Sequence, residues 1–352
     1  MNMTYVMESE IYSQPEILDN LVKTYIKNYC VMIDIPIDVS RISIIASGSS
    51  YNAGCFAKCF FQNISGVETS VNYASEIANS DFVNFDKNTL YIFISQSGKS
   101  SDVVNSFNKV KPCGAKTISI TNNRESVLHN EADFAFDINA GREYAVAATK
   151  TFSASVLMLW ILAVKIAQNK HIDVSEEVKN IYMLKEDIEH SVKDLDNIDS
   201  AVKLLSGLKD FSIAGLGEYY PLAREASLKI KETCYINTGS YPMGEFVHGH
   251  FALLNKSKVF LTFIVHDAKQ NELDLLNKIL TTYKTKSIVV SDLYEDYNCD
   301  MLIKFNKTNS KIATILSLIM IIQILAFKMA VRLKRNVDKP NGLNKIVEDK
   351  RV

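Results

Sequence analysis

The sequence lacks an excess of charge: 39 lysine and arginine residues balance 40 aspartate and glutamate residues, and the formal net charge is −1. Binding to nucleic acid or to an anionic membrane surface depends on a basic patch, which this balance does not supply. Residues 1–11 carry Glu8 and Glu10 and have no basic-then-apolar signal pattern. No uninterrupted apolar run reaches the roughly 18 residues that span a bilayer. We therefore expect no nucleic-acid partner and no membrane partner.

Cysteine patterns that hold metals are also missing. Cys55 and Cys59 lie four positions apart, and no second ligand pair with zinc spacing accompanies them. The sequence predicts no cofactor and no metal. We interpret six cysteines as reduced thiols of a cytoplasmic protein: Cys30, Cys55, Cys59, Cys113, Cys234 and Cys299.

What the sequence does contain is an alternation of strands and helices. Short apolar runs rich in β-branched and aromatic residues predict strands at residues 42–46, 67–73, 90–94, 115–121 and 134–138. A helix is expected over residues 51–62, and a long one from residue 147 to about 170. This order is typical of a parallel sheet covered by helices on both faces.

The same order returns in the second half of the chain. Strands are expected at residues 210–214, 258–265, 286–291 and 301–305, with a closing helix over 311–335. The alignment that brings Gly48 onto Gly217 also brings Glu76 onto Glu245. We interpret this as an internal repeat. The predicted fold class is therefore α/β, with two similar doubly wound parallel-sheet domains in tandem.

The predicted domain bounds follow from this repeat. We expect an N-terminal helical segment at residues 1–38, with one helix over 15–30. The first domain is expected at 39–171, a helical linker at 172–199, the second domain at 200–335 and a C-terminal tail at 336–352.

A serine-rich loop at residues 95–101, Ser-Gln-Ser-Gly-Lys-Ser-Ser, follows the predicted strand 90–94 and precedes a helical pattern. Free N–H groups at a helix start favour an anion, and the serine hydroxyls and the Gln96 amide would add donors around a phosphate. An ordinary capped turn explains the loop, taken alone, equally well. A P-loop is excluded, because it requires a glycine five residues before Gly98 and that position holds Phe93.

The second copy of the repeat has lost this loop. The same alignment brings Ser95 onto Ile264, within the sequence Phe-Ile-Val-His. We therefore expect one phosphate site per chain, on the first domain.

Six motifs, in order, make the chain resemble the sugar isomerase (SIS) domain family. The resemblance is to the tandem pair of such domains in the isomerase half of glucosamine-6-phosphate synthase and in related deaminases and isomerases. The motifs are ASGSSYNA at 46–53, SQSGKSSD at 95–102, AGREYAVAATKTF at 140–152, REASLKIKET at 224–233, GEFVHG at 244–249 and DKPNGLNK at 338–345.

The resemblance implies a sugar phosphate as substrate and a two-domain doubly wound fold. In that family the first two loops bind the sugar phosphate. Carried over to this sequence, the implied substrate-binding residues are Ser47, Gly48, Ser49, Ser50, Ser95, Gln96, Ser97, Ser100, Val146 and Glu225.

The expected chemistry lies in the second half. In a helix, Glu225, Lys229 and Glu232 share one face, a pattern that by itself more often forms a solvated ion-pair network. The resemblance makes Glu232 the base that moves a proton between C1 and C2 of the sugar, with Lys229 as its polar partner. It makes His248 the ring-opening group. Lys345 matches the lysine that forms an imine with the open-chain ketose.

Four positions depart from the family pattern. Ser47 replaces a common cysteine, Lys99 a frequent acidic residue, Ala148 a serine and His250 a proline. His248 and His250 could chelate a metal, but no further ligands accompany them, so we expect none. Lys99 and Ala148 leave the identity of the sugar open.

These observations predict an enzyme, a phosphosugar isomerase acting on a hexose 6-phosphate. In particular, they predict an amino-sugar-6-phosphate isomerase and deaminase that yields fructose 6-phosphate and ammonia. The chain starts without a glutamine-hydrolysing domain, so glutamine-dependent synthesis is not expected. A fructosamine-6-phosphate deglycase and a non-catalytic sugar-phosphate-sensing module stay open as alternatives. As in the family, we expect a homodimer with shared active sites.

Overall fold

The computed structural model describes residues 5–35, 38–81, 84–254, 258–283, 285–293 and 297–345. The chain divides into two compact units. Unit 1 holds residues 1–11 and 186–343, and unit 2 holds residues 12–185 and 344–352. The division therefore falls within the predicted linker 172–199 and within the predicted tail 336–352.

Unit 2 contains a five-stranded parallel sheet in the order β4-β3-β5-β6-β7. Its strands are β3 (Arg41–Ala46), β4 (Glu68–Tyr73), β5 (Leu90–Ile94), β6 (Thr117–Thr121) and β7 (Phe134–Asp137). In order along the chain this is the 2-1-3-4-5 arrangement of flavodoxin-like folds. The strand order reverses between β3 and β5, where ligands of such folds bind.

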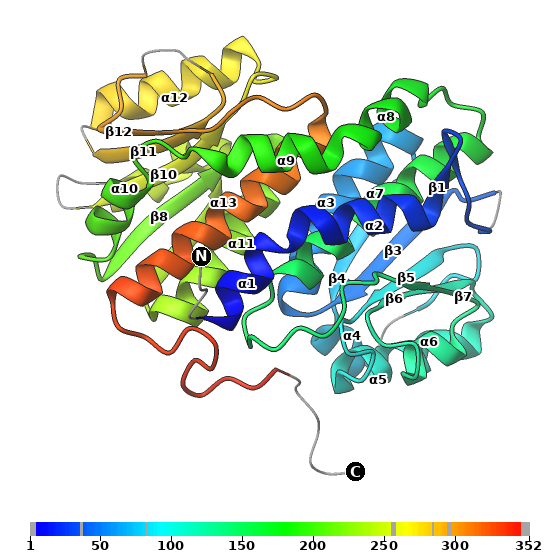
Figure 1. Ribbon diagram of the computed structural model, residues 1–352. Coiled ribbons are helices and arrows are strands. Elements are labelled where there is room, and N and C mark those ends of the chain that lie inside the picture. The colour runs from blue at the N-terminus through cyan, green and yellow to red at the C-terminus, as the bar shows by residue number, and fades with distance from the viewer. Residues whose placement is uncertain are drawn as a thin grey trace. The chain divides into compact units, whose positions relative to one another are not determined.

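Helices cover both faces of this sheet (Figure 1). One face carries α2 (Gln14–Tyr25), α3 (Gly48–Ser65) and α7 (Lys150–Asn169), and the other carries α4 (Ala74–Asn79), α5 (Ser101–Val110) and α6 (Val127–Glu131). Successive side chains of β3 point to opposite faces accordingly: Ile44 faces α3, and Ile45 joins the cluster around Phe93 and Phe107 under α5. The unit also contains α8 (Ser175–Asn180).

The prediction of a wholly helical start is wrong after Tyr25. The helix α2 ends there, and β1 (Ile26–Lys27) pairs antiparallel with β2 (Cys30–Val31). The two residues between them, Asn28 and Tyr29, have φ angles of 49° and 63°. Two consecutive positive φ angles make the tight turn of a hairpin, which ends the helix.

Unit 1 repeats the sheet of unit 2, with all strands parallel in the order β12-β11-β10-β8-β9. Its strands are β8 (Asp210–Gly215), β9 (Asn237–Pro242), β10 (Val259–Ile264), β11 (Lys286–Ser291) and β12 (Met301–Lys304). The alignment of Gly48 with Gly217 carries the bounds of β3 onto those of β8, and the bounds of β4 onto those of β9. The predicted repeat and the predicted fold class are both confirmed, although β9 was not predicted as a strand.

Apolar side chains of α12 (Gln270–Tyr283) pack on one side of the unit 1 sheet, against Ala214, Phe260 and Val289. The helix α11 (Tyr220–Cys234) packs against β8, β9 and the long helix α13 (Lys311–Arg332), with α10 (Ile198–Leu205) beside α13 (Figure 1). The start of α1 (Val6–Tyr12) belongs to this unit, and α9 (Leu184–Lys193) begins at the division between the units.

Within the described part of the chain, two helices, α7 and α13, are long and apolar enough to cross a membrane by length and composition. The requirement for an uninterrupted apolar run, which we applied to the sequence, was therefore too strict to detect these two helices. Core helices of globular units pass the same test, and 89% and 94% of the most apolar 18-residue stretches of α7 and α13 are buried. Length and composition alone are thus weak evidence for a membrane span here.

Candidate active site

In unit 2 the serine-rich loop connects β5 to α5 at the point where the strand order reverses. Ser95 Oγ accepts a hydrogen bond from the Gly98 N–H at 3.1 Å and lies 3.2 Å from Ser100 Oγ. Ser97 Oγ accepts from the Lys99 N–H at 3.2 Å. Ser95 and Ser97 are buried, whereas Lys99 is exposed. The hydroxyls are therefore held in place around the start of α5 by the loop itself.

Gly98 is required at the turn of this loop. Its φ is +64°, and an added Cβ would lie 2.1 Å from Ser126 Oγ. The Ser126 hydroxyl cannot simply move away, because it accepts from the His129 N–H at the start of α6 and donates to the Asn123 carbonyl oxygen at 2.7 Å. The loop and the next connection of the sheet are thus packed directly against each other.

We expect Gly98→Ala to destabilise the protein by at least about 2 kcal/mol, since it combines left-handed backbone strain with a steric clash. It should also weaken the binding of sugar phosphates. Gly114→Ala is the matched control, because Gly114 has φ +76° with no atom within 4 Å of the added Cβ. Urea denaturation and phosphate-ester binding measure both effects. Equal destabilisation by the two substitutions would show that the clash has no consequence.

A second loop meets the first at the same edge of the sheet. Ala46 of β3 is in register with Ile94 of β5, so Ser47 and Ser95 leave neighbouring strands side by side. Gly48 has φ +58°, and Ser47 precedes α3 without using its side chain as a cap. The remaining predicted phosphate-loop residues, Ser49 and Ser50, lie in the first turn of α3 and are half-buried. Two helix starts and several hydroxyls therefore surround one place, which suits an anion.

The same edge is hollowed beside Gln96. A surface hollow of about 570 Å³ continues along the ends of β6 and β7. Polar residues dominate its lining: Gln96, Asn122, Asn123, Asp137, Asn139, Gly141 and Arg142. The surroundings of the loop therefore suit a polar ligand.

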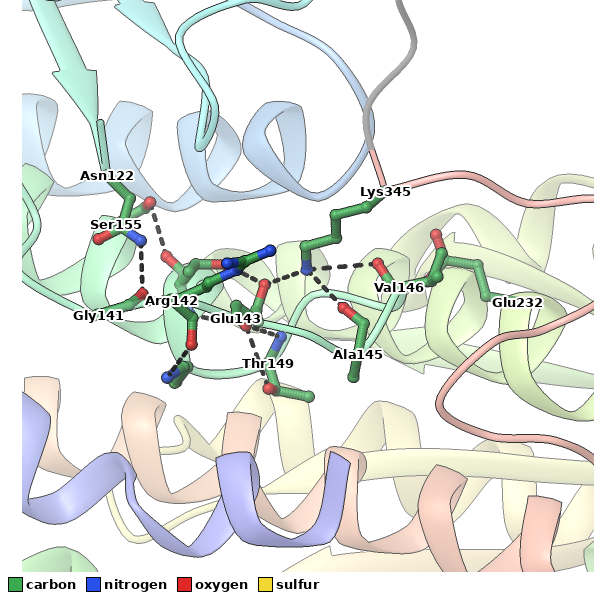
Figure 2. Close-up of polar contacts among 12 residues, drawn as sticks. Asn122, Gly141, Arg142, Glu143, Ala145, Val146, Thr149, Ser155, Glu232 and Lys345 are labelled. Carbon is green, nitrogen blue, oxygen red and sulfur yellow. Dashed lines mark hydrogen bonds and ion pairs between the residues drawn. The ribbon is translucent and has the colours of Figure 1, made fainter. Parts of the chain in front are cut away.

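Lys345 belongs to unit 2, although it is far along the chain from the rest of that unit. Its ammonium forms an ion pair with Glu143 and donates hydrogen bonds to the carbonyl oxygens of Ala145 at 2.7 Å and Val146 at 3.5 Å (Figure 2). The structure thus brings together the predicted imine lysine and the predicted binding residue Val146. The lysine side chain keeps 22% of its surface exposed.

Glu143 is the residue that the sequence reasoning missed. Its carboxylate is fully buried and accepts from the N–H groups of Thr149 and Thr151 at 2.9 and 3.1 Å. Burial raises the pKa of Glu143, but the attraction of Lys345 and these hydrogen bonds outweigh it, so the pKa lies below its ordinary value of 4.5. The signal in the sequence was an acidic residue within the third motif, preceded by Arg142 and followed by the mostly apolar residues 144–148.

This pKa predicts a contribution to acid stability. Because the native pKa is lowered, the unfolded chain binds the proton more tightly, and the contribution is present above pH 4.5 and lost as the pH falls through the native pKa. We expect Glu143→Gln to cost about 2 kcal/mol near neutral pH, the range for a hydrogen bond to a charged group. The cost should shrink toward about pH 3.

Urea denaturation across that pH range measures this cost. The half-exposed Glu131, paired with Lys111, provides the control Glu131→Gln, for which we expect a change below about 1 kcal/mol. A Glu143→Gln deficit that does not depend on pH would contradict the assigned ionisation.

In unit 1 the helix α11 presents Glu225, Lys229 and Glu232 on one face, as predicted. The Lys229 ammonium lies 2.5 Å from Glu232 Oε2 and 3.5 Å from Glu225 Oε1. The side chains of Glu225 and Lys229 are fully buried, and Glu232 keeps 23% of its surface exposed. A buried charge needs a partner, so Lys229 is held by both carboxylates. The face is a buried network with one carboxylate open to solvent, which differs from a solvated ion-pair face.

His248 lies at the end of a short 3-10 helix (Met243–His248) of unit 1, and its side chain is exposed. Among the described residues the structure shows no hydrogen bond or ion pair for it. His250 packs against the Tyr241 ring, with 4.5 Å between ring centroids. The described residues contain no group of three or more histidine, cysteine, aspartate or glutamate side chains able to hold a metal ion.

Part of the sixth motif is structural. Asp338 accepts hydrogen bonds from the Val6 and Met7 N–H groups at 3.1 and 2.8 Å, which caps the start of α1 within unit 1. The sequence reasoning treated this motif only as the setting of Lys345.

The amino-acid sequence is similar to those of known proteins. Residues 37–165 match the SIS domain family. A glutamine–fructose-6-phosphate aminotransferase (isomerizing) from Campylobacter jejuni is 31% identical over 97% of this chain. This chain spans 58% of that relative's length.

Solved structures match nearly the whole chain as well. The C-terminal domain of glucosamine-fructose-6-phosphate aminotransferase from Francisella tularensis matches 96% of this chain and 99% of its own, with a TM-score of 0.90 and 28% identity. Glucosamine-6-phosphate deaminase from Thermotoga maritima matches 98% of this chain and all of its own, with a TM-score of 0.78 and 22% identity. At that identity the second match supports the fold alone.

Proposed function

We propose that this chain, which belongs to the SIS domain family, is a phosphosugar isomerase acting on a hexose 6-phosphate. In particular, we propose that it converts glucosamine 6-phosphate and water to fructose 6-phosphate and ammonia. The observation that supports this best is the α11 face of unit 1, where buried Lys229 holds a solvent-accessible Glu232 carboxylate. A similarity to an isomerizing aminotransferase over nearly the whole chain agrees with it.

The proposed reaction uses the two halves of the chain for different tasks. The loops after β3 and β5 bind the phosphate through Ser47, Ser95 and neighbouring donors. Glu232 removes the proton from C2 of the open-chain sugar and returns it to C1, with Lys229 stabilising the carboxylate. His248 opens the ring, because an imidazole can give and take a proton near neutral pH.

The remaining predicted residues are divided between the phosphate end and the reacting end of the sugar. Ser49, Ser50, Gln96, Ser97 and Ser100 are assigned to the phosphate and the nearby hydroxyls. Gly48 allows the backbone to approach the ligand. Val146 and Glu225 are assigned to the reacting end of the sugar.

Incubation with glucosamine 6-phosphate tests the proposal directly. We expect fructose 6-phosphate and ammonia in equal amounts, and exchange of the C2 proton in heavy water. Turnover of fructosamine 6-phosphates with no turnover of glucosamine 6-phosphate would replace the proposal with the deglycase alternative. Tight binding without proton exchange at C2 would replace it with the sensing alternative.

We further propose a homodimer in which His248 completes the active site of the partner subunit. The exposed position of His248 and its lack of polar contacts among the described residues support this. A cytoplasmic location is part of the same proposal and is supported by the free cysteines.

Mixing two inactive variants tests the shared site. Glu232→Ala and His248→Ala chains should each be inactive, and refolding them together should restore about a quarter of the native activity. That fraction follows because half of the dimers are mixed and each mixed dimer has one intact site. Activity that stays at the level of the separate variants would show that each chain provides its own histidine.

A further inference from the structure

Among the residues that the structure describes, Lys345 is held by acceptors alone. Its ammonium contacts the Glu143 carboxylate and the carbonyl oxygens of Ala145 and Val146, so all three of its N–H groups have partners (Figure 2). Each of these acceptors takes up an N–H group of the ammonium, because a carbonyl or carboxylate oxygen can only accept a hydrogen bond here. The amine that forms an imine must be neutral, since the ammonium has no lone pair.

The carboxylate that holds the lysine is fixed by other residues. Glu143 Oε1 accepts from the Thr149 N–H, the Thr149 hydroxyl at 3.2 Å and the Thr151 N–H, and Oε2 accepts from the Thr151 hydroxyl at 2.7 Å. These donors come from the start of α7, a helix of 20 residues packed in the core of unit 2. Glu143 is therefore held in place by donors other than Lys345.

We propose that Glu143 is a positioning residue that holds Lys345 as an ammonium in the resting protein, so that the lysine reacts with a sugar carbonyl only after this contact opens. The proposal rests on the proposed function together with the resemblance in the sixth motif, which assigns the imine to Lys345. It goes beyond that function because it assigns a role to Glu143 and an unreactive state to the lysine.

The step that follows release is balanced without a co-reactant. The ammonium loses one proton to water, and its lone pair forms the C–N bond with the carbonyl carbon. The carbonyl oxygen then leaves as water, taking one proton from the nitrogen and one from the solvent. The products are an iminium ion and one water molecule.

Competitive acetylation with trace acetic anhydride tests the resting contact without requiring turnover. Peptide mass spectrometry compares the labelling rate of Lys345 with that of Lys231, which is exposed on α11. We expect Lys345 to react at least about tenfold more slowly than Lys231 in the native protein, and within about threefold of Lys231 in Glu143→Gln. Glu131→Gln, which removes a surface carboxylate of the same unit, should leave the native ratio unchanged.

Equal labelling of Lys345 in native protein and in Glu143→Gln would overturn the proposal. If circular dichroism shows that Glu143→Gln does not fold, the labelling rates in the native protein still test the proposal. Labelling of Lys345 as fast as that of Lys231 would contradict the contact with Glu143. Borohydride trapping with fructose 6-phosphate separates this proposal from the function on which it rests. If Lys345 is acetylated slowly and no sugar is trapped, the contact with Glu143 is supported and the imine is rejected. If sugar is trapped and Lys345 is acetylated fast, the imine is supported and the contact is rejected.

Discussion

Replacing Glu232 with glutamine is expected to lower kcat by about a thousandfold, the middle of the range for removing a general base. Glutamine keeps the size of the side chain and can still accept a hydrogen bond from the Lys229 ammonium, but it cannot take a proton. KM should change by less than about threefold, because the phosphate loops are in the other unit. Exchange of the C2 proton in heavy water measures the lost step directly.

The control for this prediction is Lys231→Gln, on the same helix. Lys231 is exposed and lies outside the Glu225–Lys229–Glu232 face, so its replacement should leave kcat within about twofold. The melting temperature of both variants should be measured as well. In Glu232→Gln the buried Lys229 keeps only Glu225, at 3.5 Å, as a charged partner of this face, and the variant can lose stability for that reason. A folded Glu232→Gln protein with native proton exchange would reject Glu232 as the base.

Replacing Lys345 with methionine is expected to lower turnover by more than about a hundredfold, because the covalent route through the imine is removed. Borohydride should no longer attach the sugar to the protein in the presence of fructose 6-phosphate. Methionine also leaves the buried Glu143 carboxylate without its charged partner, although its hydrogen bonds from Thr149 and Thr151 remain. The double variant Glu143→Gln/Lys345→Met avoids this and should be equally inactive.

Lys339→Met is the matched control for this experiment, since Lys339 is exposed in the same tail. It should keep native turnover and native trapping. Native turnover by Lys345→Met would show that the reaction uses no protein lysine, and the resemblance on which the assignment rests would then fail at that position.

Most strands of the two sheets were predictable because their signals are local. The strand β5 was predicted with its observed bounds, and the alignment of Gly48 with Gly217 relates β3 to β8 and β4 to β9. Apolar runs report burial, and inner strands of a parallel sheet such as β5, β6 and β10 are buried along their whole length. The strand β9 was not predicted, because its burial is partial along most of its length and its sequence contains Gly239 and Pro242.

The hairpin after α2 was missed for a different reason. Its residues continue the apolar pattern of the helix, and the two positive φ angles at Asn28 and Tyr29 are not visible in that pattern. Asparagine adopts this conformation more readily than most residues, and it was the only local signal.

Parts of the candidate site were also predictable. Helical spacing placed Glu225, Lys229 and Glu232 on one face, and the ion pairs in the structure confirm that arrangement. Their roles, like those of His248, Lys345 and the serine loops, remain predictions. The spacing could not distinguish a solvated face from a buried one, since the helix period is the same in both cases.

The sequence by itself determined two parallel sheets, one serine-rich loop and a helix with three charged residues on one face. These follow from patterns that repeat over a few residues. Only the tertiary structure decided that Glu143 meets a lysine 202 positions later, and that Gly98 packs against Ser126. Such contacts depend on how the chain returns to the same edge of a sheet, and no local pattern encodes the position at which it arrives.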